Sequence, residues 1–447
     1  MKLFTPRLLR SCAALMAAGA LLPAVARCID EDNVEMRPST NANGSPVDAG
    51  SARVNLTTMV QEAVRRSQAV GASKLLAEAA AIDLGETKAS RWPQLSANGF
   101  LGTTDSQAPD VIEQRGKQGR VGLSLSAPLF DGGRTSELID WRKNLTEAAR
   151  LNEISAEEQV ALQTVSLAIE RSRFRLQVQV YQQYSRKMSC LVEALETIVR
   201  ADKGRASELV QAQKNLQQAD LQQAQTLSMV RQIETRLRRF VGDGLPSTDG
   251  LSSLLLMPPA LPDLLAQAER APDIEQLQSQ VQAAEAYSRS ISATRWPQVN
   301  VVAGNNIVRG VGHGSNWQAG ITVNMPLITP TLGYTIDASA KRAEAVKLQR
   351  IDAIEARKFR MAEVHEQALS SFDKARRTVD VLRDSDRVRN FTLQQWQQLG
   401  RRSLFDVMAS EGEHYGLRVS YVNALYDGEQ STALLWSLGL GVLAQLK

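Results

Sequence analysis

The sequence of 447 residues contains few aromatic side chains, which make up 5% of it. Compact cores usually hold more Phe, Tyr and Trp, because each of these residues buries a large area. The sequence also lacks any run of 18 consecutive apolar residues, so no segment predicts a membrane-spanning helix. What it has instead is abundant Ala, Gln, Leu, Glu and Arg, a composition that favours long, thinly packed helices.

Cysteine is scarce as well, with residues only at positions 12, 28 and 190. Cys12 falls in a predicted signal peptide, Cys28 in a predicted disordered segment and Cys190 in a helical stretch, so we expect no structural disulfide. A lipid-modified cysteine needs small residues just before it, whereas Ala26 and Arg27 precede Cys28. We therefore expect no lipid anchor.

Residues 1–26 are typical of a secretory signal peptide. They have a basic start, an apolar run over 13–22 and an A-x-A cleavage site at 24–26. Their removal takes away three basic and no acidic residues, which lowers the formal charge from +4 to about +1. Nucleic acid is therefore not an implied partner. Residues 27–52, rich in Asn, Ser, Asp and Gly, predict a disordered lead-in.

Proline is absent from two long stretches, 129–245 and 331–447. Long helices exclude proline, because it costs about 3 kcal/mol in a helix interior. Apolar residues from Leu151 to Ile198 recur at helical spacing in the first stretch. A helix over 133–203 would be about 100 Å long, so each stretch predicts a long helical hairpin that turns near Gly204 or Gly400. The alternative is a bundle of several short helices, which the scarcity of Gly and Pro disfavours.

The chain contains an internal duplication. The segment ASRWPQL at 89–95 returns as ATRWPQV at 293–299, and GLSLSAPL at 122–129 returns as GITVNMPL at 320–327. A third echo, GRAS at 204–207, returns as GRRS at 400–403. Three echoes in one order predict two structural repeats, 53–250 and 251–447, each with a helix, a strand pair and a long helical hairpin.

Each repeat also predicts two short membrane strands. Apolar and small polar residues alternate over 121–127 and 317–325, as expected when one face meets lipid and the other water. The polar set predicted to face the lumen is Ser124, Ser126, Gln318, Thr322 and Asn324. Residues 94–102 and 298–308 are less regular partner strands, and polar links are expected over 102–119 and 310–315. About ten residues cross a bilayer when the strand is tilted.

Three tryptophans are candidates for the membrane interface. Trp92 and Trp296 precede the first strand of each pair, and Trp317 lies in the last strand. Aromatic residues form girdles at both interfaces of outer-membrane barrels. For Trp92 and Trp296, ordinary packing at a helix–strand junction is an equally good interpretation.

Four strands cannot close a barrel, and an open edge in lipid leaves backbone groups without hydrogen bonds. Identical copies must complete the wall, which a cyclic homo-oligomer does with one repeated interface.

This order of elements resembles the TolC-like outer-membrane efflux protein family. The resemblance is carried by the WPQ strand entries at 92–94 and 296–298, the APLFDGG strand exit at 127–133 and the tip LGRRSLFDV at 399–407. The second strand exit, at 326–331, departs from the family form. The resemblance implies an α+β membrane protein: a homotrimer with four strands per protomer in a twelve-stranded β-barrel, continued by a long periplasmic α-helical barrel. Implied partners are outer-membrane lipid, a periplasmic adaptor and an inner-membrane transporter, either an ABC exporter or a proton-driven pump.

The resemblance also implies roles for the periplasmic tip. Asp406 falls on an acidic position that lines the closed tip, and Arg402 on a position that links neighbouring hairpins. Ala409 stands where some members carry a second Asp, so one acidic ring is absent. The alternative for both charges is a solvated helix turn. The adaptor would grip the two turns, at Gly204, Arg205, Ser207, Leu209, Gly400, Arg401, Ser403, Leu404 and Phe405.

The predicted function is an exit duct in the outer membrane with a periplasmic extension. The hairpin over 399–439 is most similar to family members that serve type I protein secretion; small-molecule or drug efflux is the alternative. A soluble periplasmic coiled-coil scaffold or adaptor is an alternative of a different class. His313, His365 and His414 are scattered, so we expect no catalytic residue, metal or cofactor.

Overall fold

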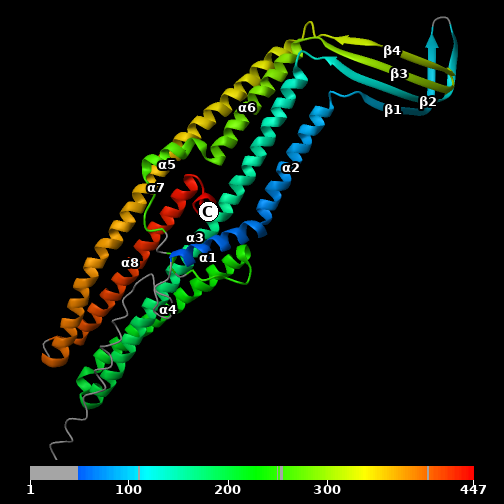
Figure 1. Ribbon diagram of the computed structural model, residues 1–447. Coiled ribbons are helices and arrows are strands. Elements are labelled where there is room, and N and C mark those ends of the chain that lie inside the picture. Colours follow the sequence, from blue (N-terminus) through cyan, green and yellow to red (C-terminus); the bar gives the residue numbers. More distant parts are fainter. Residues whose placement is uncertain (1–48, 109–110, 249, 252–254, 400–401, 447) are drawn as a thin grey trace, which may run out of the picture.

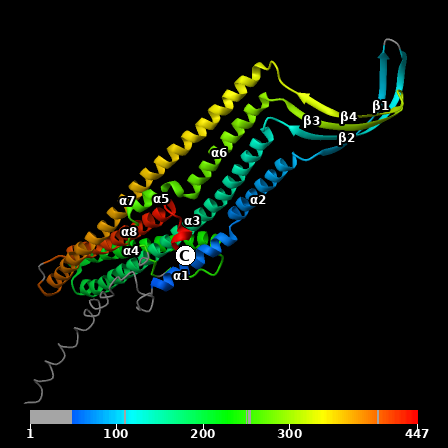
Figure 2. The same ribbon diagram turned by 45° about the horizontal axis from the view of Figure 1, so that its top comes forward.

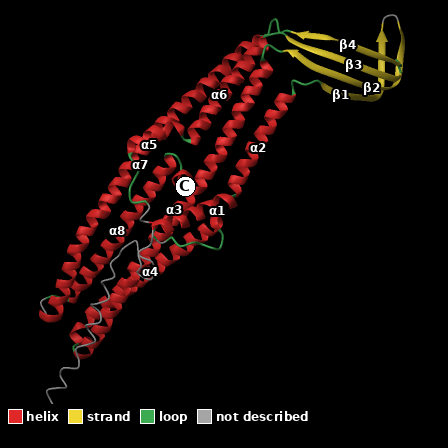
Figure 3. Cartoon of the chain, in the orientation of Figure 1, coloured by secondary structure: helices red, strands yellow, loops and turns green. Residues whose placement is uncertain are grey.

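The computed structural model describes residues 49–108, 111–248, 250–251, 255–399 and 402–446 (Figure 1). It shows long helices side by side with one small sheet at the end of the helical part, as Figure 3 makes plain. The predicted signal peptide, most of the predicted lead-in, and Gly400 and Arg401 lie outside the described residues.

The sheet has four antiparallel strands: β1 (Gln94–Ala108), β2 (Val111–Phe130), β3 (Gln298–Gly310) and β4 (Gly314–Asn324). Their order is β1-β2-β3-β4, so the four predicted strands are confirmed and β1 and β4 form the two open edges. The expected link over 102–119 is wrong, because both strands continue into it. Polar side chains keep the same register there, with Thr103 opposite Lys117 and Asp105 opposite Arg115.

The longest helices are α3 (Arg134–Ala201) and α7 (Pro330–Leu399), of 68 and 70 residues. Each is about 100 Å long at 1.5 Å per residue. Two helices of half that length fold back along them: α4 (Ala206–Val241) and α8 (Leu404–Leu438). The predicted long helical hairpins are therefore present. Within the described ranges, no helix combines the length and apolar character needed to cross a membrane.

The first hairpin turns at Gly204, as predicted, but the glycine does not adopt a left-handed conformation. Gly204 lies in a short 3₁₀ turn, Lys203–Arg205, and is not among the glycines with positive φ. Its amide donates to Asp202 Oδ1 at 3.0 Å. Asp202 therefore organises this turn, and a left-handed glycine cap is not needed.

Four helices lie side by side next to the sheet, in the order α2-α3-α6-α7 (Figures 1 and 2). The shorter two are α2 (Gln68–Ala89) and α6 (Pro272–Ser292). Helix α2 leads into edge strand β1, and edge strand β4 leads into α7. One flank of the protomer therefore carries α2 with β1, and the other carries β4 with α7.

The largest core lies where α1 (Ala49–Arg66) and the C-terminal α9 (Val442–Leu446) pack on α3, α4 and α8. A smaller core joins α5 (Leu261–Gln267) to α7 and α8. The predicted stripe of α3 supplies much of the buried surface. Fully buried members of the two cores include Leu56, Met59, Val165, Ile169, Leu237, Met361 and Leu435.

Cys190 contradicts the expectation of no structural disulfide, because it is disulfide-bonded. The other two cysteines, Cys12 and Cys28, lie outside the described residues. Cys190 is half-buried in α3. Around the helix it lies between the side of the fully buried Leu195 and the side of the exposed Glu193. A helical position at the edge of the apolar stripe leaves the sulfur within reach of another segment, which the prediction did not consider.

Candidate functional site

The sheet has one polar face, which contains all of the predicted lumen residues. Strand register aligns Ser96, Ser124, Gly304 and Gln318 in one row, and Ser96 Oγ lies 2.7 Å from Ser124 Oγ. Side chains alternate along each strand, so residues an even number of positions away share this face. The polar residues of this face are Gln94, Ser96, Asn98, Gln118, Arg120, Ser124, Ser126, Asn300, Gln318, Thr322 and Asn324, and the apolar Phe100, Val302 and Val308 lie among them.

The opposite face is apolar and exposed. Leu101 and Trp317 are 89% and 74% exposed in the protomer. Aligned with them by the register are Leu95, Val121, Leu123, Leu125, Val301, Ile307, Ile321 and Val323. An apolar face of this extent is not stable in water, and a lipid-facing barrel wall needs this alternation. Trp317 lies on this face near the end of the β3–β4 hairpin that is remote from the helices.

Asp131 fixes the exit from β2 into α3. Its Oδ1 accepts from the Gly133 amide at 3.0 Å and its Oδ2 from the Thr135 amide at 2.6 Å. Partial burial opposes ionisation, but the hydrogen bonds from Thr135 and Gly133 and the charge of Arg134 outweigh it and lower the pKa of Asp131. Gly132 and Gly133 have φ of 64° and 87°, the left-handed region that favours glycine.

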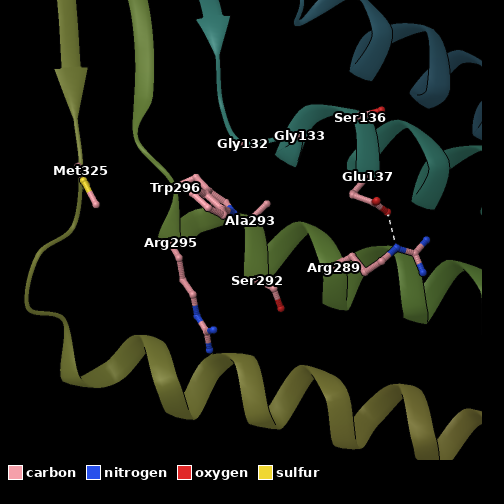
Figure 4. Close-up of a pocket in the computed structure, with 10 residues that line it drawn as sticks. All are labelled: Gly132, Gly133, Ser136, Glu137, Arg289, Ser292, Ala293, Arg295, Trp296 and Met325. Atoms are coloured by element: carbon pink, nitrogen blue, oxygen red, sulfur yellow. Dashed lines mark hydrogen bonds and ion pairs between the residues drawn. The ribbon is translucent and has the colours of Figure 1, made fainter.

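Trp296 packs against this exit, as Figure 4 shows. A Cβ placed on Gly132 would lie 2.4 Å from the Trp296 Cβ, so the two repeats meet here with no room for a side chain. Close by, Arg289 Nε donates to Glu137 Oε2 at 2.8 Å and ties α6 to α3 (Figure 4). Trp296 is still 59% exposed and Trp92 is 72% exposed, so both present rings at the sheet–helix junction.

At the tip, Ser403 and Asp406 form a capping box that starts α8. The Asp406 amide donates to Ser403 Oγ at 3.3 Å, and the Ser403 amide donates to Asp406 Oδ2 at 3.2 Å. Arg402 lies 3.9 Å from Asp406 and donates to Gln395 at 3.3 Å. The two predicted gate residues are thus brought together, within one turn of one protomer.

The other predicted tip residues divide into two groups. Leu404 is fully buried and Leu209 packs partly against the same tip core, formed by Met188, Leu191, Val192, Leu195, Ala212, Leu393, Val407 and Met408. Gly204, Ser207, Ser403 and Phe405 are exposed, and Arg205 is half-buried. The exposed group is available to a partner, whereas the buried group holds the two hairpins together.

A buried ionic cluster next to the tip was not predicted. Glu411 of α8 is fully buried, 3.8 Å from Lys187 of α3 and 3.5 Å from Arg389 of α7, and both cations are 7% exposed. The cluster joins the α3–α4 hairpin to the α7–α8 hairpin along the line where α8 packs against α3 and α7, which we call the seam. Its signal in the sequence is a spacing of alternating four and three residues along α8, at Leu404, Met408, Glu411, Tyr415, Arg418, Val422, Leu425, Glu429 and Thr432. Charged residues interrupt the apolar pattern of this run, so the pattern was not recognised in the sequence.

Glu429 occupies a seam position five turns beyond Glu411. It is also fully buried, but among the described residues its carboxylate has no hydrogen-bond partner. Burial raises its pKa well above the ordinary value. The two buried carboxyl groups of α8 therefore differ in their surroundings, because Glu411 forms ion pairs with Lys187 and Arg389 whereas Glu429 has no salt bridge among the described residues.

No cluster of three or more His, Cys, Asp or Glu side chains suited to a metal ion occurs in the described part of the chain. The site consists, as far as the structure reaches, of a wall with two unlike faces and a tip held by local contacts.

Comparison with known proteins agrees with this geometry. Residues 59–243 match the family model of the outer membrane efflux protein. The fold is similar to that of CusC (TM-score 0.78, 16% identity, 87% of this chain and 92% of that chain). It is also similar to VceC from Vibrio cholerae (0.73, 15%, 87% and 97%) and to the open state of MtrE from Neisseria gonorrhoeae (0.72, 16%, 87% and 89%). No curated protein matches the sequence. Over residues 59–243 the sequence is thus similar to the outer membrane efflux protein family, and over most of its length the chain has the fold of solved outer-membrane channels.

Proposed function

We propose that three identical copies of this chain close into one exit duct, with twelve strands in the outer membrane and a helical tube in the periplasm. The observation that carries the proposal is the pair of open flanks. On one flank, edge strand β1 and helix α2 have no further strand or helix of the described chain on their outward side. On the other flank, the same is true of edge strand β4 and helix α7. A single repeated contact between these flanks completes the sheet and the helical layer together.

Exposed apolar residues support this contact. On α7 they are Leu348, Ile351, Phe359, Leu369, Val381, Val388 and Phe391, between 43% and 76% exposed. At about 100° per residue they fall within a sector of roughly 120°, which is one face of the helix. On α2, Leu75, Leu76 and Ile82 are more than 60% exposed. Each face buries its apolar area only if a neighbouring copy covers it.

In the closed ring the polar face of the sheet lines the lumen and the apolar face meets lipid. Ser124, Ser126, Gln318, Thr322 and Asn324 then line a water-filled passage. At the periplasmic tip, three copies of Asp406 surround one axis and favour cations, while Arg402 holds the closed state through charge-assisted hydrogen bonds. A periplasmic adaptor docks on the exposed residues of the two turns.

A charge placed in the α7 stripe tests the ring. Phe359→Glu should prevent trimer formation, because a carboxylate cannot be buried there without a partner. Lys347→Glu, an exposed position off the stripe, is the matched control and should leave the trimer intact. The measurement is the size of the protein extracted from outer membranes in mild detergent. A trimer that persists in Phe359→Glu would contradict the proposed contact.

For the cargo, we infer secreted protein carried by an ABC exporter. Two features support it: the likeness of the hairpin over 399–439 to type I secretion members, and the absence of a lipid-attachment pattern before Cys28. Small-molecule efflux with a proton-driven pump remains the second candidate, because the fold is shared. A deletion strain separates them. Loss of one large protein from the medium supports secretion, whereas increased drug sensitivity with an unchanged secretome overturns it.

A further inference from the structure

The outer face of the sheet carries a cluster of cations where its apolar surface ends. We propose that Arg115, Lys117 and Arg309 bind the phosphate groups of a phosphorylated glycolipid in the outer leaflet. The proposal rests on the proposed outer-membrane barrel. It concerns the end of the sheet remote from the periplasmic helices, beyond the β3–β4 hairpin, where β1 and β2 run on (Figure 2).

The strand register places the three cations on one face. Arg309 of β3 pairs with Gly119 of β2. Lys117 and Arg115 lie two and four residues before Gly119, so their side chains are on the same face as that of Arg309. The described register is continuous from Gln94 to Ser106, so this is the face that carries Leu101 and Val121. Diagonal and same-strand neighbours of this kind lie about 7 Å apart. All three side chains are exposed.

The three cations lie where the apolar surface of this face ends, on the side remote from the helices. Between Arg309 and the end of the sheet next to the helices, the same face has Ile307, Val121 and Leu101 and no charged residue along the paired register as far as Leu95. A group that lies just above acyl chains is a lipid headgroup, so the position selects a headgroup over a soluble ligand.

The cluster has an unbalanced positive charge. The acidic residues of the four strands are Asp105, opposite Arg115, and Glu113, two positions before Arg115 on β2. Among the described residues, Asp105, Arg115, Lys117 and Arg309 form no salt bridge. Three cations and two acidic residues leave a net +1 per protomer, so phosphate, which accepts several charge-assisted hydrogen bonds, is the complementary group.

The test uses the full-length detergent-extracted trimer and native mass spectrometry with bisphosphorylated lipid A or its dephosphorylated form. Wild-type protein should retain the phosphorylated lipid. The variant R115Q/K117Q/R309Q should bind it about 100-fold more weakly, from roughly fivefold per cation. The control is Arg120→Gln, which removes a cation of the same strand from the polar face and should keep wild-type retention.

Several outcomes would overturn the site. They are equal retention of the dephosphorylated lipid, an equal loss in Arg120→Gln, and displacement of the lipid by millimolar inorganic phosphate, which would make the ligand free phosphate. Trimer mass is read in the same spectra. If the wild-type protein or a variant is not a trimer, the proposed ring is refuted. If it is a trimer that does not retain the lipid, the ring stands and the lipid site is refuted.

Discussion

Two buried glutamates of α8 should respond in opposite ways to the same substitution. Glu411 lies 3.8 Å from Lys187 and 3.5 Å from Arg389, and all three side chains are at least 93% buried. Glu411→Gln keeps the shape but removes the charge that balances two cations. Breaking a buried pair in this way costs about 3–5 kcal/mol. Glu429→Gln removes a carboxyl group that has no cation beside it, so it should not destabilise the protein.

The expected size follows from the length of the chain. An unfolding entropy of about 2.1 cal/mol/K per residue gives ~0.9 kcal/mol/K for each protomer, so 3–5 kcal/mol lowers Tm by about 3–5 °C. The assay is the loss of helical circular dichroism on heating, in detergent at pH 7.5. Equal falls in Tm for Glu411→Gln and Glu429→Gln would refute the argument, because they would show that the cations beside Glu411 contribute nothing.

The pH dependence of the Glu429 variant is a further check. Burial raises the pKa of Glu429 in the folded chain above its ordinary value of 4.5, so the folded chain binds this proton more tightly than the unfolded chain. The contribution of Glu429 to stability therefore falls as pH rises from about 4.5 toward the raised pKa. Glutamine has no proton to lose. The Tm advantage of Glu429→Gln should thus be absent near pH 4.5 and grow as the pH is raised.

Three other expectations concern the junction and the disulfide. Gly132→Val should lower Tm and the yield of trimer, because a side chain there meets Trp296 and adopts a strained φ; Gly133→Val, strained but with open space, should do less. Asp131→Ala should cost about 1 kcal/mol in thermal unfolding, the typical value of a helix cap. Because the pKa of Asp131 is lowered in the folded chain, this loss should shrink as pH falls below 3.8, and a loss that does not change with pH would disagree with a role of the ionised group. If the predicted signal peptide is cleaved after residue 26, Cys12 is removed, and peptide mapping of the mature protein without reductant should find Cys190 joined to Cys28; a lipid on Cys28 would contradict this.

The sequence predicted the long helices and the strands well for simple reasons. Proline-free stretches and helical spacing are local signals, and α3 follows them from Arg134 to Ala201. Alternation over 121–127 likewise gave the two faces of the sheet, because a period of two fixes which side chains share a face. The extension of β1 and β2 was missed because polar residues such as Thr103 and Lys117 carry no apolar alternation, although their pairing continues.

The buried seam could not be predicted in the same way. Glu411 and Arg418 look like surface charges in a linear sequence, and only the packing of α3 and α7 against α8 shows that they are buried. The turn near Gly204 was predicted, but the contact that shapes it was not. A glycine after a helix suggests a left-handed cap, but here Asp202 provides the hydrogen bond that shapes the turn. Whether Arg402 and Asp406 act across protomers stays a prediction.

The arrangement of the two flanks has a consequence for the dimensions of the passage. Because β1 continues α2 and β4 continues α7, each added copy would widen the membrane pore and the periplasmic tube by a fixed ratio. The bore of one segment cannot be enlarged by changing stoichiometry without enlarging the other. Evolution can therefore fit this conduit to bulkier cargo only by reshaping strands or helices within a subunit, or by opening the tip.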